Sequence, residues 1–208
     1  MIDLASGQEH ASMAAEVLIM LTGNWWWIAL AVTGSFLLLS TSQVTVSPPK
    51  VVDNVDLERY TGRWYSIAHI PTTFERGCAA GTTATYELSL DGKIEVVNEC
   101  YNKQGLLKVA RGKAWIPNPQ QPAKLKVSFV QVFGVSLFAG DYWIIDLAPD
   151  YSYAVVGHPT RKYGWVLSRT PTLPEDKLQE IKSSLQEQGY DWSHFQLIDQ
   201  SVHAAGGS

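Results

Sequence analysis

The chain has 208 residues, of which 46% are hydrophobic and 17% are charged. This composition supplies enough apolar material for a folded core of one domain or two small ones, and it excludes a disordered chain. The formal net charge of −4, with no run of lysines or arginines, argues against a nucleic-acid partner.

The first notable segment is apolar and covers residues 17–39 without a charged residue. It is long enough to cross a bilayer, while its denser half, residues 25–39, has the length of the apolar part of a signal peptide. No lysine or arginine precedes Lys50, although both kinds of segment usually carry positive charge. We expect residues 1–42 to be a signal peptide or a membrane anchor with a hydrophobic helix. The protein is then exported or membrane-associated, in the periplasm or outer membrane if it is bacterial; a buried helix of a soluble protein is the alternative.

Residues 43–51, with two consecutive prolines, are interpreted as a linker to a domain over residues 52–200. Short runs of alternating apolar and polar residues, bounded by turn residues, then predict eight antiparallel strands. These cover residues 63–70, 82–90, 93–101, 107–116, 124–130, 141–147, 151–157 and 163–168. Eight sequentially connected strands predict an all-β, up-and-down barrel that can hold one small ligand, and an open sandwich is the alternative.

The hairpin between the second and third strands bears on the two cysteines. Asp-Gly at residues 91–92 predicts a two-residue turn. In that register Cys100 faces Thr83 rather than Cys78, although both cysteines lie on the same face. A bulge at Gly81 can bring them together. An oxidising compartment favours a Cys78–Cys100 disulfide, and two buried free thiols are the alternative.

After the last strand the apolar period becomes helical. Thr172 and Glu175 form a capping-box pattern. A one-sided apolar stripe follows, which predicts a helix packed outside the barrel: Leu178, Ile181 and Leu185. Gly189 is expected to end this helix. Residues 195–198 are expected to add a short ninth strand, and residues 201–208 are expected to form a flexible tail.

Several of these stretches resemble motifs of the lipocalin family. Residues 62–65, Gly-Arg-Trp-Tyr, resemble the first motif, and residues 165–171 resemble the third. Residues 140–143 stand where the second motif falls, as a looser match. Residues 74–77 and 114–129 are similar to the bacterial outer-membrane Blc type, which is akin to apolipoprotein D. The resemblance covers about residues 52–198 and implies that the barrel is a lipocalin calyx.

The resemblance also implies a function and three structural residues. It implies storage or transport of small hydrophobic or amphiphilic ligands, such as fatty acids or lysophospholipids, for membrane maintenance. It implies that Arg169 lies across Trp64 at the closed end, where a guanidinium gains cation–π attraction from an indole. Gly62 lets the chain turn into the first strand. Bacterial members are typically lipid-anchored through a cysteine, and because no cysteine lies just after the apolar segment, anchoring by that route is not expected here.

In such a barrel the mouth lies opposite Trp64 and is lined by the loops at residues 71–81, 102–106, 131–140 and 158–162. The third loop is unusually apolar, which is typical of ligand, membrane or protein contact. Basic residues on the same rim suit an anionic head group. We expect ligand contacts from Phe74, Tyr86, Phe129, Phe133, Phe138, Tyr142, Arg76, Arg161 and Lys162. The alternatives are that the apolar residues fold back into the core and that the basic residues are solvated surface charges.

Two other functions remain open. Some lipocalins are isomerases with a nucleophilic cysteine in the barrel, a role for Cys78 or Cys100 that requires a lowered thiol pKa. No catalytic, metal-binding or cofactor-binding motif accompanies the cysteines, so we expect no enzyme, no metal and no cofactor. The other function is a protein-interaction module, including a homodimer, that acts through the apolar mouth loop.

Overall fold

The computed structural model describes residues 47–133 and 135–204. The hydrophobic helix expected within residues 1–42 lies outside these ranges. Over the residues that are described, no helix combines the length and the apolar character needed to cross a bilayer.

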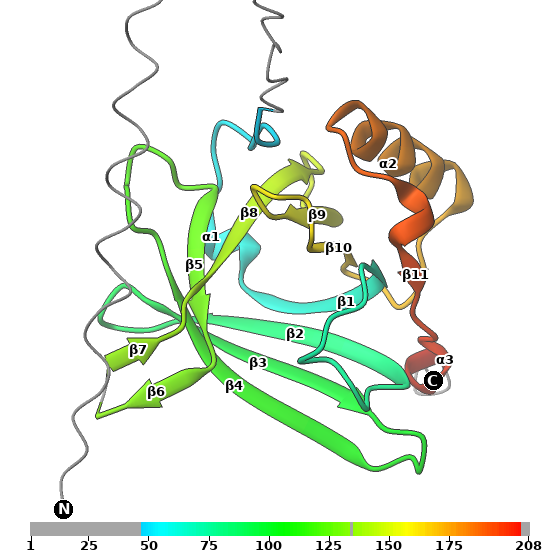
Figure 1. The fold of residues 1–208 in the computed structure, drawn as a ribbon, viewed down its shortest axis with the longest axis horizontal. Coiled ribbons are helices and arrows are strands. Elements are labelled where there is room, and N and C mark those ends of the chain that lie inside the picture. The colour runs from blue at the N-terminus through cyan, green and yellow to red at the C-terminus, as the bar shows by residue number, and fades with distance from the viewer. Residues whose placement is uncertain (1–46, 134, 205–208) are drawn as a thin grey trace, which may run out of the picture. The chain divides into compact units, whose positions relative to one another are not determined.

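Eight antiparallel strands form a closed barrel (Figure 1). They are β1 (Gly62–His69), β2 (Ala80–Leu88), β3 (Ile94–Tyr101), β4 (Leu107–Trp115), β5 (Lys124–Ser128), β8 (Gly140–Leu147), β9 (Tyr153–Gly157) and β10 (Gly164–Ser168). Each strand pairs with its neighbours along the chain, and β10 pairs with β1 to close the sheet. The predicted up-and-down barrel is confirmed, and the open sandwich is wrong.

A short helix and a glycine lead the chain into the barrel. The carboxylate of Asp56 accepts hydrogen bonds from the backbone N–H groups of Glu58 and Arg59, which caps α1 (Leu57–Tyr60). Gly62 then adopts a φ of +90°, a conformation that strains residues with a side chain. This turn aims the fully buried Trp64 into the barrel.

Alternation along the strands produces an inner and an outer apolar layer. The outer layer is completed by α2 (Glu175–Glu187), which buries Leu178, Ile181 and Leu185. Ile181 and Leu185 belong to one cluster with Ile67, Val155 and Val166 of the barrel strands. Figure 1 shows α2 outside the barrel beside β9 and β10, as the apolar stripe predicted. The helix ends before Gly189, whose φ is +80°.

The predicted capping box at the start of α2 is wrong. The helix begins at Glu175, and its N-cap residue is Pro174, which makes no side-chain capping bond. Pro174 has an extended ψ of 142°, so the residues before it cannot belong to the helix. Thr172 therefore lies too far from the first turn to cap it.

The turn between β2 and β3 has three residues rather than the predicted two. Ser89 N–H donates to the carbonyl of Lys93, and Gly92 N–H donates to the carbonyl of Ser89. Gly92, at a φ of +76°, closes a three-residue loop of the kind that ends in a left-handed residue. The register consequently shifts by one, so that Ala84 pairs with Asn98.

Cys78 and Cys100 form a disulfide, with their Cα atoms 5.5 Å apart. The pairing of β2 with β3 changes register between Ala80 and Thr83, and Gly81 between them has a φ of +62°. The predicted bulge and disulfide are both confirmed. Because both cysteines of the chain are bonded, the free-thiol alternative and the cysteine nucleophile are wrong for this structure.

The mouth loop expected at residues 131–140 contains a two-stranded ribbon. β6 (Val130–Val132) pairs with β7 (Val135–Leu137), and this pair is separate from the barrel sheet. The buried hydroxyl of Ser128 donates toward the carbonyls of Val130 and Leu137, which fixes the base of the ribbon. Figure 1 shows the ribbon leaving the barrel between β5 and β8.

The segment before the barrel packs against it. Pro49 is buried, and the backbone N–H of Lys50 donates to Oε1 of Gln188 over 2.8 Å. Val52 N–H donates to the carbonyl of Ile144. Residues 47–51, the described part of the expected linker, are therefore held against the barrel by hydrogen bonds.

The C-terminal end is also ordered further than expected. A 3₁₀ turn, η1 (Trp192–His194), leads to β11 (Gln196–Leu197), which pairs with β1 and confirms the predicted ninth strand. The expectation of a flexible tail is wrong for residues 201–204, which form α3 (Ser201–Ala204). The reason lies just before it, where the buried amide of Gln200 donates to the carbonyls of Ser66 and Thr82.

Candidate ligand-binding cavity

The barrel interior is a cup rather than a filled core. An inner cavity of about 100 Å³ lies near the closed end, and an outer cavity of about 550 Å³ lies toward the mouth. The two share wall residues, including Phe74, Val127 and Phe129. Small residues on β4 make the space: Ala110 lines the outer part, and Ala114 lines the inner part.

Five of the six aromatic residues predicted to contact a ligand line this cup. Tyr86 and Tyr142 line the inner cavity. Phe74 and Phe129 line both cavities, and Phe138 lines the outer one. Phe133 does not, because it sits at the tip of the β6–β7 ribbon with its side chain fully exposed.

None of the three predicted basic residues lines either cavity. Arg161 is bound elsewhere: its Nε donates to the carbonyl of Gln188 over 2.6 Å, and its Nη2 donates to the carbonyl of Ser47 over 2.7 Å. Arg161 therefore ties the β9–β10 loop to the end of α2. Arg76 and Lys162 are exposed.

The outer cavity is lined by a lysine, Lys108, that was not predicted as a ligand contact from the sequence. Its Nζ donates to the carbonyl of Arg76 over 3.2 Å. Lys108 has the same parity on β4 as Ala110 and Ala114, both of which line the cup. That alternation was the signal that could have identified it.

Three tyrosine hydroxyls meet at the floor of the inner cavity. The hydroxyl of Tyr142 lies 2.8 Å from that of Tyr60 and 2.9 Å from that of Tyr86. Burial raises the pKa of Tyr86 to about 12 and raises the pKa values of Tyr60 and Tyr142 well above 10.0. The floor is therefore uncharged at any physiological pH, and it is polar.

Below this floor, Arg169 closes the barrel over Trp64. The guanidinium carbon of Arg169 lies 3.7 Å from the centre of the Trp64 ring. Its Nη1 and Nη2 donate to the carbonyls of Arg63 and Arg59. We call the Trp64–Arg169 pair the plug. Trp64 Nε1 donates to the carbonyl of Tyr60, so the plug also positions one tyrosine of the floor.

A carboxylate with several hydrogen bonds stands near the mouth. Glu75 accepts hydrogen bonds from Thr72 Oγ1 over 2.6 Å and from Trp165 Nε1 over 3.1 Å, and it lies 3.0 Å from His69 Nδ1. Burial acts to raise the pKa of Glu75, but the hydrogen bonds from His69, Thr72 and Trp165 outweigh it and hold the pKa below 4.5. This cluster fastens the β1–β2 loop, which carries Phe74, to the wall of the cup.

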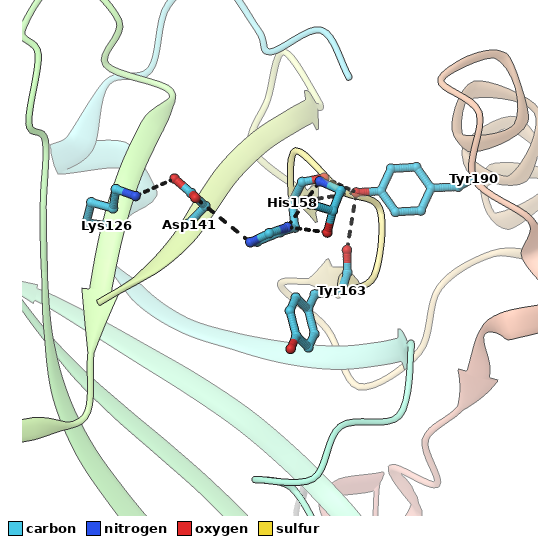
Figure 2. Close-up of polar contacts among 6 residues, drawn as sticks. Lys126, Asp141, His158, Tyr163 and Tyr190 are labelled. Carbon is cyan, nitrogen blue, oxygen red and sulfur yellow. Dashed lines mark hydrogen bonds and ion pairs between the residues drawn. The ribbon is translucent and has the colours of Figure 1, made fainter. Parts of the chain in front are cut away.

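A second polar cluster holds the β9–β10 loop at the mouth (Figure 2). Asp141 lies between Lys126, at 2.8 Å, and the ring of His158, at 3.9 Å. The backbone N–H of His158 donates to the hydroxyl of Tyr190, which in turn donates to the carbonyl of Tyr163. Burial lowers the pKa of His158; Asp141 opposes this effect, and Lys126 and then Lys162 add to it.

These clusters have the geometry of supports rather than of a reactive centre. Across residues 47–133 and 135–204, no group of three or more His, Cys, Asp or Glu side chains is arranged to hold a metal ion. Both cysteine sulfurs are bonded to each other. The arrangement can enclose an apolar molecule and offer it a few polar contacts at the floor and the mouth.

The barrel coincides with a known family of domains. A family model described as a Lipocalin-like domain matches residues 55–200, which include every element from α1 to β11. The chain belongs to the lipocalin family. The family predicted from the three sequence motifs is confirmed.

Two relatives place this lipocalin more closely. It is 40% identical over 177 residues to outer membrane lipoprotein Blc of Escherichia coli K12, covering 83% of this chain and 96% of that protein. It is 36% identical over 163 residues to apolipoprotein D of Mus musculus, covering 74% of this chain and 82% of that protein. The predicted likeness to Blc and apolipoprotein D is therefore confirmed.

Solved structures agree on the fold of this lipocalin. The crystal structure of lobster apocrustacyanin A1 matches with a TM-score of 0.54 and 19% identity, covering 75% of this chain and 92% of that chain. At this identity the match supports the barrel fold alone.

Proposed function

We propose that this lipocalin stores or transports a small hydrophobic or amphiphilic molecule, such as a fatty acid or lysophospholipid, in its barrel. The observation that carries the proposal is the apolar cup, with an outer part of about 550 Å³ that suits a ligand of this size. Aromatic side chains along its wall, such as Phe129 and Trp165, supply contact area for an acyl chain.

The head group of such an amphiphile belongs at the mouth. Lys108 lines the outer cavity and replaces Arg161 as the candidate partner for a phosphate or carboxylate. Arg76 and Lys162 stay candidates as exposed charges near the same loops. The Glu75 carboxylate, which also lines the outer cavity, disfavours an anionic group placed next to it.

We place the protein outside the cytoplasm or at a membrane. Its relative in Escherichia coli is named an outer membrane lipoprotein, and the Cys78–Cys100 disulfide suits an oxidising compartment. We also propose that the protein serves membrane maintenance, and that residues 1–42 are either cleaved as a signal peptide or retained as a membrane anchor. Protein sequencing of the mature N-terminus from the native host distinguishes cleavage from retention.

A matched pair of substitutions on β4 tests the cavity as the binding site. Ala110 lines the cup, and Arg111 is exposed at the next position along the strand, where the side chain points to the opposite face. Ala110→Trp fills the cup, so it is expected to weaken binding of a fluorescent fatty acid by at least about tenfold. Arg111→Trp adds the same ring outside and is expected to leave binding unchanged. Equal affinities for both variants and the wild type overturn the proposal.

A protein-interaction module is the second candidate, and the β6–β7 ribbon favours it. Its side chains Val132, Phe133 and Val135 are exposed, which is typical of a contact surface. This surface and ligand binding are compatible. Native mass spectrometry distinguishes the two candidate functions. A retained lipid supports storage or transport of a ligand, and a lipid-free homodimer supports the interaction module.

A further inference from the structure

The three tyrosine hydroxyls at the floor of the cup carry more O–H protons than the hydrogen bonds among them require. Tyr60, Tyr142 and Tyr86 together carry three O–H protons. The two contacts between them, Tyr60 with Tyr142 and Tyr142 with Tyr86, use two of these protons. No other side chain or carbonyl in the described ranges hydrogen bonds to the three hydroxyls, so one O–H group is left over.

The surplus donor faces the ligand space. All three tyrosines line the inner cavity, and Tyr60 and Tyr86 are buried. The hydroxyls are uncharged because burial raises their pKa values. A plain hydrocarbon chain that reaches this floor covers the O–H group without pairing it, and an unpaired buried donor opposes binding.

Three further buried polar atoms on residues of the inner cavity wall have no hydrogen-bond partner among the described residues. They are Ser66 Oγ, Thr83 Oγ1 and Asn98 Oδ1. Ser66 is 3% exposed. Asn98 is two positions along β3 from Val96, which pairs with Tyr86, so it occupies the next inward site above the floor.

We propose that the ligand carries an oxygen on the end that enters the barrel first, and that the tyrosine floor donates a hydrogen bond to that oxygen. The ligand class is an oxygenated acyl chain, such as a hydroxy or keto fatty acid. A hydroxyl group suits the site best, because it accepts from the floor and can also donate to Asn98 Oδ1. This inference rests on the proposed function and adds the chemistry of the buried end of the ligand.

The structure dictates which variant tests the proposal. A single Tyr60→Phe or Tyr86→Phe substitution removes one proton and one bond, so one surplus donor remains. The triple variant Tyr60→Phe, Tyr86→Phe, Tyr142→Phe removes every donor and keeps the three rings. Tyr142→Phe alone removes the shared partner and leaves two surplus donors. Tyr65→Phe is the control, since Tyr65 lies on β1 and packs with the outer layer against His203.

The measurement is displacement of a fluorescent fatty acid from the full chain by matched pairs of competitors. The pairs are palmitic acid with ω-hydroxypalmitic acid, and lauric acid with ω-hydroxylauric acid, so that two chain lengths sample the depth of the cup. The quantity compared is the affinity ratio of the hydroxy acid to its parent. Melting temperatures of all variants are recorded beside it.

The wild type is expected to bind one hydroxy acid at least as tightly as its parent. The triple variant is expected to lower that ratio by about tenfold, the size of one hydrogen bond. Tyr142→Phe is expected to weaken the parent acid and leave the ratio at or above that of the wild type, which tests the proposal even if the triple variant does not fold. Tyr65→Phe is expected to match the wild type.

Two results overturn different claims. If the affinity ratio is the same in the wild type, Tyr142→Phe and the triple variant at both chain lengths, water accepts the surplus hydrogen bond from the tyrosine hydroxyls. This inference is then wrong, while the proposed lipid binding is unaffected. If the wild type binds neither acid of either pair, the proposed function itself is wrong.

Discussion

The guanidinium carbon of Arg169 lies 3.7 Å above the ring of Trp64, although 105 positions separate the two residues (169 − 64). This contact joins the last barrel strand to the first at the closed end. Arg169 also donates to the carbonyls of Arg59 and Arg63, so it fixes α1 and the start of β1 at once. The plug is a determinant of the fold and lies outside the ligand space.

Replacing Arg169 with lysine is expected to reduce stability without changing ligand choice. Lysine keeps the charge but lacks the planar fork that reaches several carbonyls. We expect the free energy of unfolding to fall by about 1–3 kcal/mol, measured by denaturant titration. Arg111→Lys on the exposed part of β4 is the control. A changed preference between two ligands in Arg169→Lys contradicts the assignment as a plug.

Removing the disulfide is expected to destabilise the domain and loosen the mouth. The bridge spans a sequence separation of 22 residues, for which the chain-entropy model gives about 3 kcal/mol. Cys78→Ser/Cys100→Ser and the reduced wild type should lose similar stability in denaturant titrations. Both cysteines line the outer cavity, so fatty-acid affinity should fall as well. Identical midpoints with and without reductant contradict the prediction.

Glu75 is expected to contribute stability that depends on pH. Its pKa in the folded protein lies below 4.5, so the unfolded chain takes up the proton more readily. The contribution is therefore fully present above about pH 4.5 and is lost as the pH falls through the folded-state pKa. Glu75→Gln should flatten the acid limb of a plot of unfolding free energy against pH, whereas Glu87→Gln, at an exposed site, should not. An unchanged acid limb in Glu75→Gln contradicts the claim that the hydrogen bonds to Glu75 contribute pH-dependent stability.

Two phenylalanines of the β6–β7 ribbon form a matched pair for separating ligand from partner contacts. Phe138 lines the outer cavity, and Phe133 does not. Both are exposed and both have a positive φ, of 54° and 48°, which asparagine tolerates. Phe138→Asn is expected to weaken fatty-acid binding by several-fold to about tenfold, and Phe133→Asn is expected to leave it unchanged. Fluorescence titration of both variants checks this, and a larger effect at Phe133 reverses the assignment.

Much of the barrel followed from patterns that act over short distances. Strand alternation located all eight barrel strands, and the apolar stripe located α2. The hairpin at Gly92 was predicted one residue too short, because the same Asp-Gly pair fits a two-residue turn and the end of a three-residue turn. That single error moved the expected partner of Cys100 along β2.

The candidate site was harder to predict because its polar contacts join distant elements. Arg161 is adjacent to Lys162 in the sequence, yet its guanidinium binds the end of α2, a partner that no local pattern indicates. Tyr60 belongs to α1, yet its hydroxyl meets that of Tyr142 on β8, and Trp64 Nε1 donates to its carbonyl. Basic and aromatic residues can be located on strands from sequence, but the atoms they reach depend on how the barrel closes.

The depth of the tyrosine floor has a consequence for which isomers of a ligand can bind. Tyr86 pairs with Val96 and Gly62 near the closed end, whereas Lys108 pairs with Cys100 near the mouth. The rigid sheet fixes the span between these two levels. A chain whose two oxygens match that span satisfies both ends at once, and a positional isomer satisfies only one. In the binding mode that we propose, the barrel therefore selects ligands by the position of the second oxygen along the chain.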